Sequence, residues 1–129
     1  MTKITWKPGT MLAPVPPALI SCGTVEKPNV MTAAWTGIIA SEPAMTYVSI
    51  RPSRYSHELI KESGEFVINL TNLPLVKAAD YCGVKSGRDI DKFAEMNLTA
   101  EACSQVKAPQ IAESPVSLEC KVKEVTRYG

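Results

Sequence analysis

Five short runs of apolar and β-branched residues, separated by clusters of Gly, Pro, Asn and Ser, most strongly limit what this chain can fold into. Runs of this length and composition are typical of β-strands. We expect about five strands, over residues 19–24, 30–40, 45–50, 65–70 and 116–125. The second run is long enough for a helix, but its β-branched residues and internal Gly37 favour a strand that bends or bulges at the glycine.

Short helices are expected between these strands. Ser53 can cap a helix that Gly64 ends. Asn72 can cap a second helix over residues 75–82, and a third short helix is expected around residues 92–96. The predicted fold class is therefore mainly β with short helical insertions, in a barrel-like arrangement. The last strand lacks a return partner, so we expect either a truncated chain or an edge that pairs with a second chain.

Composition places the chain among ordinary globular proteins. It has 129 residues, of which 45% are hydrophobic and 21% charged, with a net charge of +1. We therefore expect a single domain over residues 1–129. The near-neutral charge argues against a general nucleic-acid binder but is compatible with a local anion site. The N-terminus has no apolar signal segment and no run approaches a membrane span, so we expect a cytoplasmic protein that does not contact a membrane.

The sequence has few groups for metal or nucleophilic chemistry. Four widely spaced cysteines and one histidine, His57, do not form the ligand pattern of a zinc site. A histidine in the first turn of a helix is more often a surface residue than a catalytic base. The G-x-S-x-G elbow of a serine hydrolase is missing. We therefore predict no metal and assign no catalytic side chain.

The stretch SIRPSRYSHE, residues 49–58, gathers cationic and hydroxyl side chains where an apolar strand gives way to a helix. The N-terminus of a helix offers free backbone N–H groups and the positive end of its dipole, and both attract anions. Charge-assisted hydrogen bonds to a phosphate can come here from two arginines and two serines, Arg51, Arg54, Ser53 and Ser56. The alternative is a solvated loop with a serine cap. The arginine directly after the strand favours the anion site.

Two further segments carry ligand-binding patterns. Residues 29–36 have small side chains, so a flat ligand can lie against their backbone with Trp35 as a wall. The alternative, which chain physics alone favours, is a core strand packed against a helix. Residues 82–93 hold two glycines, a serine and several cations, so they predict a loop able to close over an anion. The alternative there is a mobile surface turn, and the P-loop pattern is absent.

Together and in this order, the segments resemble the flavin reductase-like, FMN-binding split-barrel family, in particular its flavoredoxin-type branch. The resemblance is carried by KPNVMTAAWTG (27–37), SIRPSRYSHELI (49–60) with EFVINL (65–70), DYCGVKSGRDIDKF (80–93) and IAESPVSLECKV (111–122). It implies a six-stranded Greek-key split β-barrel with helical insertions, a homodimer, and FMN bound near the subunit interface. Family members usually continue with another strand pair, so we expect this chain to lack the C-terminal strands of the barrel.

The resemblance also implies a set of cofactor-binding residues. Residues 32–36 would line the isoalloxazine ring and ribityl chain, largely through the backbone. The arginines and serines of the second segment would hold or flank the phosphate, and the loop would approach the flavin or its nicotinamide donor. The complete predicted set is Asn29, Thr32, Ala33, Ala34, Trp35, Thr36, Ser49, Arg51, Ser53, Arg54, Ser56, Ser86, Gly87 and Lys92.

The function that the resemblance implies is an NAD(P)H-dependent flavin reductase-like oxidoreductase. It would transfer hydride or electrons from NAD(P)H through FMN to an acceptor. In such enzymes the cofactor carries the organic chemistry and the protein orients it, which agrees with the lack of an evident acid, base or nucleophile. Two alternatives stay open. One is an FMN-binding electron carrier or flavin-storage protein without NAD(P)H activity, and the other is a ligand-free β-barrel interaction module whose arginines contact a partner.

Overall fold

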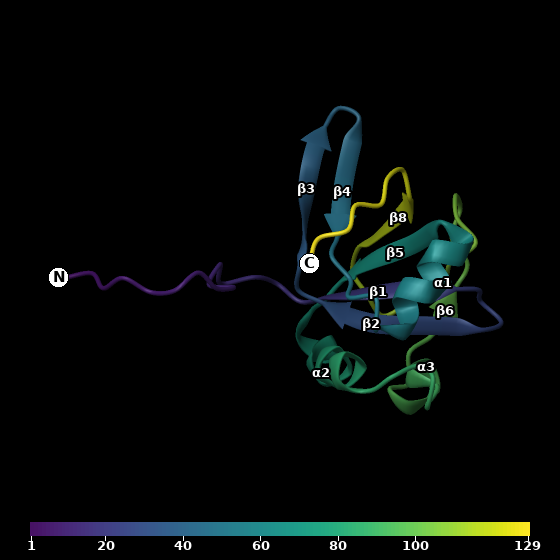
Figure 1. The fold of residues 1–129 in the computed structure, drawn as a ribbon. Coiled ribbons are helices and arrows are strands. Elements are labelled where there is room, and N and C mark those ends of the chain that lie inside the picture. Colours follow the sequence, from purple (N-terminus) through teal and green to yellow (C-terminus); the bar gives the residue numbers. More distant parts are fainter.

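The computed structural model, which describes residues 1–129, is built around a four-stranded antiparallel sheet (Figure 1). The spatial order of its strands is β2-β1-β5-β8. Their bounds are Ala18–Gly23 for β1, Pro28–Ala33 for β2, Glu65–Leu70 for β5 and Ser117–Lys121 for β8. The strands predicted over residues 19–24 and 65–70 are therefore confirmed. The last predicted strand is also present, but it is shorter than expected.

A second hairpin, of β3 (Thr36–Ser41) and β4 (Ala44–Val48), projects from one end of the sheet (Figure 1). It confirms the antiparallel return strand expected after residue 44. The prediction of one strand over residues 30–40 is wrong. The chain pairs with β1 as far as Ala33, breaks, and then pairs with β4 instead, because the two halves of the run have different partners.

Gly37 is required for packing and is not the point of a bend. A Cβ at this position would lie 2.5 Å from the ring of Tyr47, which is its cross-strand neighbour. Any side chain at this position would push the Tyr47 ring away from the strand. The irregularity in the hairpin comes just after it, as a register shift between Ile38 and Ala40.

The helices lie close to where they were expected. They are α1 (Tyr55–Ser63), the 3₁₀ turn η1 (Leu73–Leu75), α2 (Val76–Val84) and α3 (Lys92–Glu95). α1 ends at Gly64 as predicted, with a left-handed φ of 70° that lets the glycine N–H donate to the carbonyl of Ile60. The predicted Ser53 cap is wrong, because Arg54 occupies the N-cap position and no side chain bonds to the first turn. Asn72 precedes η1, also without a side-chain cap bond.

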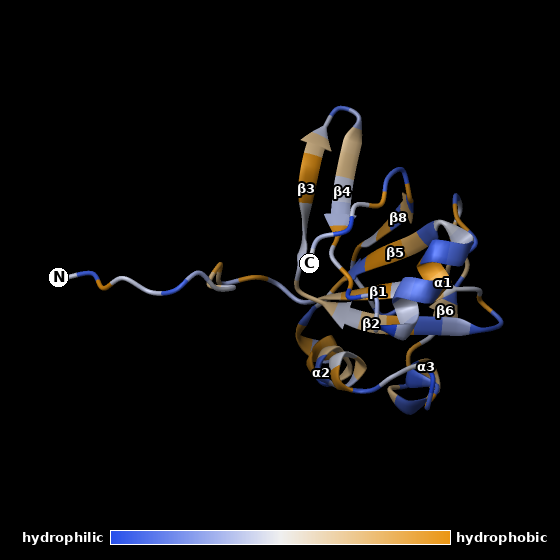
Figure 2. Cartoon of the chain, in the orientation of Figure 1, coloured by the Kyte–Doolittle hydropathy of each residue, from blue (hydrophilic) through white to orange (hydrophobic).

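The sheet separates two apolar clusters, because alternate residues of β1 point to opposite faces. On one face, Ile20 packs in a cluster with Ile60 of α1 and Phe66 of β5. On the other face, Leu19 packs in a cluster with residues of η1, α2 and α3, among them Phe93. Figure 2 shows the apolar colouring along these central strands. The sheet thus holds the start of α1 on one face and the end of α2 on the other.

Asn69 of β5 is fully buried and joins several strands. Its Nδ2 donates to the Leu19 carbonyl at 2.8 Å and to the Ser21 hydroxyl at 2.9 Å. Its Oδ1 accepts from the Ile111 N–H at 2.9 Å and from the Ser117 hydroxyl at 2.8 Å. The side chain is therefore fully satisfied, which is what allows an amide in this core.

Two peripheral segments complete the description. A pair of two-residue antiparallel strands, β6 (Ala100–Glu101) and β7 (Gln110–Ile111), was not predicted, because strands this short leave no periodic pattern in the sequence. Residues 1–17 run away from the body as an exposed, extended arm (Figure 1), as their prolines predicted. No helix has both the length and the apolar character needed to cross a membrane.

Candidate functional site

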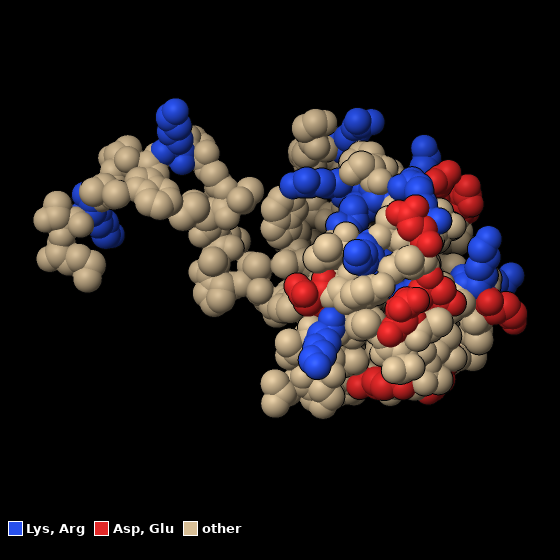
Figure 3. Space-filling view, turned by 90° about the horizontal axis from the view of Figure 1, so that it is seen from below, with Lys and Arg blue, Asp and Glu red and all other residues tan.

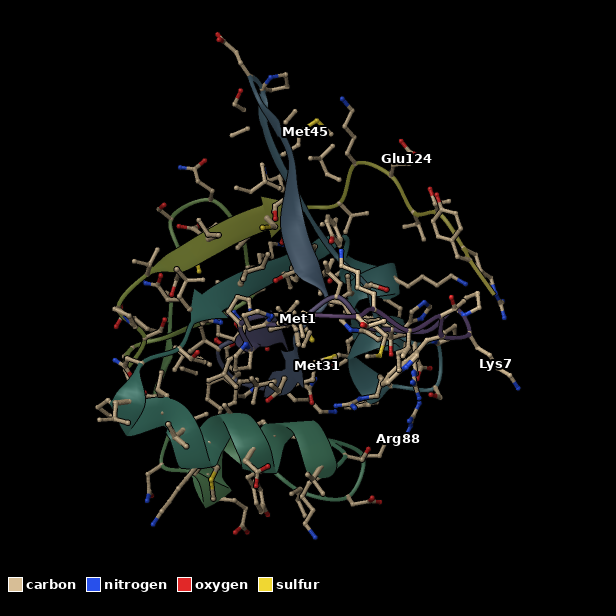
Figure 4. All side chains as sticks on the ribbon, turned by 90° about the vertical axis from the view of Figure 1, so that its left-hand side faces the viewer. Met1, Lys7, Met31, Met45, Arg88 and Glu124 are labelled. Carbon is tan, nitrogen blue, oxygen red and sulfur yellow. The ribbon has the colours of Figure 1, made fainter.

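A cavity of about 240 Å³ opens where the loop between α2 and α3 crosses the edge of the sheet at β2 and meets the start of α1. It is lined by Met31, Ser53, Arg54, Tyr55, Ser56, Val84, Lys85, Ser86, Gly87, Arg88 and Lys92. We call it the cationic pocket, because two arginines and two lysines form part of its wall. Figure 4 labels Met31, on the sheet, and Arg88, on the loop. Lys and Arg side chains lie close together on the face in Figure 3, with acidic side chains beside them.

Arg54 presents an unpaired hydrogen-bond donor inside the molecule. Its Nη1 donates to the Gly83 carbonyl at 3.3 Å, which holds the guanidinium against the end of α2. Its Nη2 is buried and has no hydrogen-bond partner. Burying a cationic donor without a partner costs free energy, and an anion placed beside it recovers that cost. The pocket is therefore preorganised for a negatively charged ligand.

Lys92, at the start of α3, adds a fully buried cation. Its side chain is only 4% exposed, and its Nζ donates to the Cys82 carbonyl at 2.8 Å. The pKa of Lys92 is lowered to about 8, chiefly by burial and to a smaller extent by the charge of Arg54, while the Cys82 and Cys22 thiols act in the opposite direction. An anion in the pocket would favour the charged form of this lysine.

Ser56 places a hydroxyl at the wall of the pocket. The side chain is 2% exposed, and its Oγ accepts a hydrogen bond of 2.7 Å from Nδ2 of Asn29 on β2. Because the amide donates, the serine hydroxyl can in turn donate its proton, either to the Cys22 sulfur or to a ligand in the pocket. Asn29 also contacts the Cys22 sulfur at 3.5 Å, and it does not itself line the pocket.

The loop of residues 85–91, which we call the 85–91 loop, forms the outer wall. Gly87 lies directly against the side chains of Asn29 and Tyr55, and a Cβ there would overlap the Asn29 oxygen and approach the Tyr55 ring to 2.9 Å. Arg88 lies over the same ring, with its Cζ 5.2 Å from the centroid. A glycine is thus needed for the loop to seat this closely.

Trp35, Ser49 and Arg51 lie outside the pocket lining, near the base of the projecting hairpin. The Ser49 N–H donates to the Trp35 carbonyl at 2.9 Å, which places the residues before Arg51 beside the start of β3. Trp35 is 45% exposed, and Ser49 and Arg51 are also exposed. An exposed indole beside small side chains provides a flat wall for an aromatic ligand.

Thr32 faces the opposite side of the sheet from the cationic pocket. Its hydroxyl donates to the Ala79 carbonyl of α2, and its side chain packs against Gly83. It lines a second cavity, of about 470 Å³, together with residues of α2 that include Val76 and Asp80. The two cavities share Val84, at the end of α2.

The structure brings together part of the predicted site. Six predicted residues line the cationic pocket: Ser53, Arg54, Ser56, Ser86, Gly87 and Lys92. Asn29 lies directly behind them. The others lie outside this pocket, and their roles stay predictions: Thr32, Ala33, Ala34, Trp35, Thr36, Ser49 and Arg51. Among these, Ala33 is a buried core residue.

Five lining residues were not in the predicted set: Met31, Tyr55, Val84, Lys85 and Arg88. The two cations flank the serine and glycine of the predicted loop, so the local charge could have indicated them. Tyr55 and Met31 carry no such signal, because they enter the site through packing of α1 and β2. His57 is half-buried and lies outside the lining.

Comparisons with known proteins agree with this arrangement. An uncharacterized protein of Archaeoglobus fulgidus is 44% identical over 118 residues, which are 92% of this chain and 66% of that protein. The structure of flavoredoxin from Desulfovibrio vulgaris (Miyazaki F) matches with a TM-score of 0.91 at 35% identity, over 98% of this chain and 69% of that chain. An FMN-binding domain of flavin reductases-like enzyme from Shewanella baltica matches with a TM-score of 0.77 at 25% identity, over 82% and 56%.

The chain thus spans about two thirds of the length of the first two relatives and a little over half of the third. The family model described as flavin reductase like domain matches residues 10–129, which include every strand, every helix and the whole cationic pocket. Its mostly-strand architecture with short helices is that of the matched structures. The chain therefore belongs to the flavin reductase-like domain family.

Proposed function

We propose that this chain binds FMN with the phosphate group in the cationic pocket. The buried, unpartnered Nη2 of Arg54 is the observation that carries the proposal, because it needs an anion beside it. Lys92 supplies a second charge, and the Ser56 hydroxyl a neutral donor. A phosphate fills only part of the cavity of about 240 Å³, which leaves room for the first carbons of the ribityl chain. The likeness to an FMN-binding domain supports FMN as the source of the phosphate.

The isoalloxazine ring, in this proposal, lies on the surface beside Trp35. The bond between Ser49 and Trp35 keeps this surface next to the segment that leads into the pocket. Arg51 and Ser49 would flank the ring or ribityl chain, because both are exposed there. The backbone of Ala34 and Thr36 would face the edge of the ring. The protein therefore anchors the cofactor at its charged end and leaves one face of the ring open.

We also propose that the chain is an oxidoreductase that takes hydride or electrons from NAD(P)H and passes them to an acceptor. When bound, FMN supplies the redox chemistry. The chain's own residues hold the phosphate, orient the ring and keep water from one of its faces. None of these tasks requires a titrating side chain at the ring.

Anaerobic mixing of the FMN-loaded protein with NADH, and separately with NADPH, tests this reaction. The account predicts that at least one nucleotide bleaches the flavin absorption band faster than it bleaches the same concentration of free FMN. If neither nucleotide bleaches the band while dithionite does, the NAD(P)H reaction is wrong and FMN binding stands.

The likeness to a flavoredoxin favours a second candidate, an FMN-binding electron carrier or flavin-storage protein. Such a protein would use the same pocket and the same exposed ring, but it would exchange electrons with another protein. The anaerobic experiment separates the two candidates, because a carrier bleaches with dithionite and is unchanged by both nucleotides.

We further propose that two copies of the chain associate through the β3–β4 hairpin. Ile38 is 85% exposed and Ile39 59% exposed, and Tyr47 also faces outward. Figure 2 shows the apolar colouring along β3 where it projects from the body. A two-stranded hairpin is marginally stable by itself, and an exposed apolar surface of this kind is typical of an interface. Light scattering should give the mass of a dimer for the wild-type chain and of a monomer for Ile38→Lys.

A further inference from the structure

The 85–91 loop is fastened to α1 by one side chain, Arg88, which makes three different contacts. Its Nη1 donates to the Ser53 carbonyl at 3.1 Å, just before α1 begins. Its Nη2 lies 3.6 Å from a carboxylate oxygen of Glu58, one turn into the helix. Its guanidinium lies over the ring of Tyr55. All three partners belong to residues 53–58, the segment that leads into α1 and lines the cationic pocket in part.

Each contact is weak by itself. The Arg88 and Glu58 side chains are about half exposed, so their ion pair is screened by water. The contact with the Tyr55 ring and the bond to the Ser53 carbonyl are also partly open to solvent. Because one planar guanidinium makes all three at once, little additional side-chain entropy is lost for each further contact. The three contacts together can hold the loop against α1, and because each is weak the loop can still open.

The position of the loop controls access to the pocket. Lys85, Ser86 and Gly87 line the pocket together with Arg54, and Gly87 lies directly against Asn29 and Tyr55. If the loop stays in place, a phosphate held by Arg54 is enclosed on this side. If it lifts, the pocket becomes an open groove at the start of α1.

We propose that Arg88 is a positioning residue, a clasp that holds the 85–91 loop over the cationic pocket and thereby sets how fast the phosphate end of the cofactor is released. The proposal rests on the proposed function, namely that the pocket holds the phosphate of FMN. Arg88 acts through the loop, and its contacts are with α1. It should therefore affect dissociation rates more than it affects the contacts of the bound phosphate.

The first part of the test needs no cofactor. Hydrogen exchange of residues 85–91 is measured in the full chain for wild type, Arg88→Gln, Arg88→Lys and the control Lys61→Gln. Lys61 is an exposed cation on α1, so its replacement removes the same charge without touching the loop. The clasp predicts exchange faster by about tenfold in Arg88→Gln, an intermediate rate in Arg88→Lys and the wild-type rate in Lys61→Gln. Equal loop exchange in wild type and Arg88→Gln would overturn the clasp.

The second part measures dissociation of FMN and of riboflavin, which lacks the phosphate, by trapping released flavin. Arg88→Gln should release FMN faster by about tenfold and riboflavin at an unchanged rate. If FMN release is unchanged although the loop exchanges faster, the loop does not enclose the phosphate and the proposal is wrong. If wild type binds no FMN, the proposed function fails, and the exchange measurement alone still decides whether Arg88 fastens the loop.

Discussion

Replacing Arg54 by methionine should separate ligand binding from fold stability, because the two depend on different atoms of the guanidinium. Methionine keeps much of the aliphatic length and removes the charge. Without ligand, the change removes one long hydrogen bond of 3.3 Å to the Gly83 carbonyl, worth about 1 kcal/mol. It also removes a buried donor without a partner, whose cost is about 1–3 kcal/mol. The free energy of unfolding of the ligand-free chain should therefore stay unchanged or rise.

Binding of FMN should change in the opposite direction. Losing at least one charge-assisted hydrogen bond, worth about 1.5–3 kcal/mol, weakens FMN affinity by about ten- to a hundredfold. Riboflavin has no phosphate, so its affinity should not change. Lys61→Met is the control, because Lys61 is an exposed cation on α1 and lies outside the pocket lining. An exposed cation is screened, so we expect the control to lose no more than about threefold.

Fluorescence titrations with both flavins and denaturant unfolding of the ligand-free chains provide the measurements. Full FMN affinity in the Arg54→Met protein would refute the assignment of the phosphate to this pocket. A fall in the free energy of unfolding by more than about 2 kcal/mol, with the FMN to riboflavin affinity ratio unchanged, would instead show that Arg54 has a structural role.

Three further predictions follow from the same structure. Burial lowers the pKa of Lys92 to about 8, so the lysine loses its charge as pH rises through that value. FMN affinity, measured by titration at several pH values, should therefore fall above about pH 8. In the Lys92→Met protein this pH dependence should be absent. Gly87→Ala should weaken FMN binding by about tenfold, because its Cβ would displace the loop from Tyr55. The control is Gly64→Ala, at a left-handed φ of 70°. It should lower the free energy of unfolding by about 1 kcal/mol and leave FMN affinity unchanged. Asn69→Ala should lower the free energy of unfolding by about 3 kcal/mol or more, measured by thermal unfolding, because it leaves several buried groups unpaired. The ratio of FMN affinity to riboflavin affinity should stay constant in the folded protein.

Local pattern was sufficient to predict elements whose ends are set by local chemistry. The run EFVINL coincides with β5, and Gly64 ends α1 because glycine tolerates the left-handed backbone there. The run over residues 30–40 could not be divided in the same way. Its first half pairs with β1 and its second half with β4, and the partners are chosen by the whole sheet. The sequence predicted a bend at Gly37, whereas the structure uses this glycine to make room for the Tyr47 ring. That ring comes from β4, so the pattern of the run itself could not indicate it.

The candidate site shows the same division. That residues near 53–56 and 85–92 bind an anion was predictable from their composition, but that they meet at the edge of β2 depends on the packing of α1 and α2. The sequence could not show which of Arg51 and Arg54, three residues apart, faces the anion site. The structure exposes the first and half-buries the second, whose Nη2 is enclosed and whose Nη1 bonds to the Gly83 carbonyl. Asn29 was likewise predicted to contact the ligand, whereas in the structure its side-chain amide donates to the Ser56 hydroxyl.

Parallel titration of the wild-type chain with FMN and with riboflavin tests the central claim most directly, because the two flavins differ only in the phosphate. We expect FMN to bind more tightly by about a hundredfold, given a buried lysine, a half-buried arginine with an enclosed Nη2, and a serine hydroxyl at the pocket. We also expect inorganic phosphate to compete with FMN and to leave riboflavin binding unaffected. Equal affinities for the two flavins, or no binding of either, would contradict the claim.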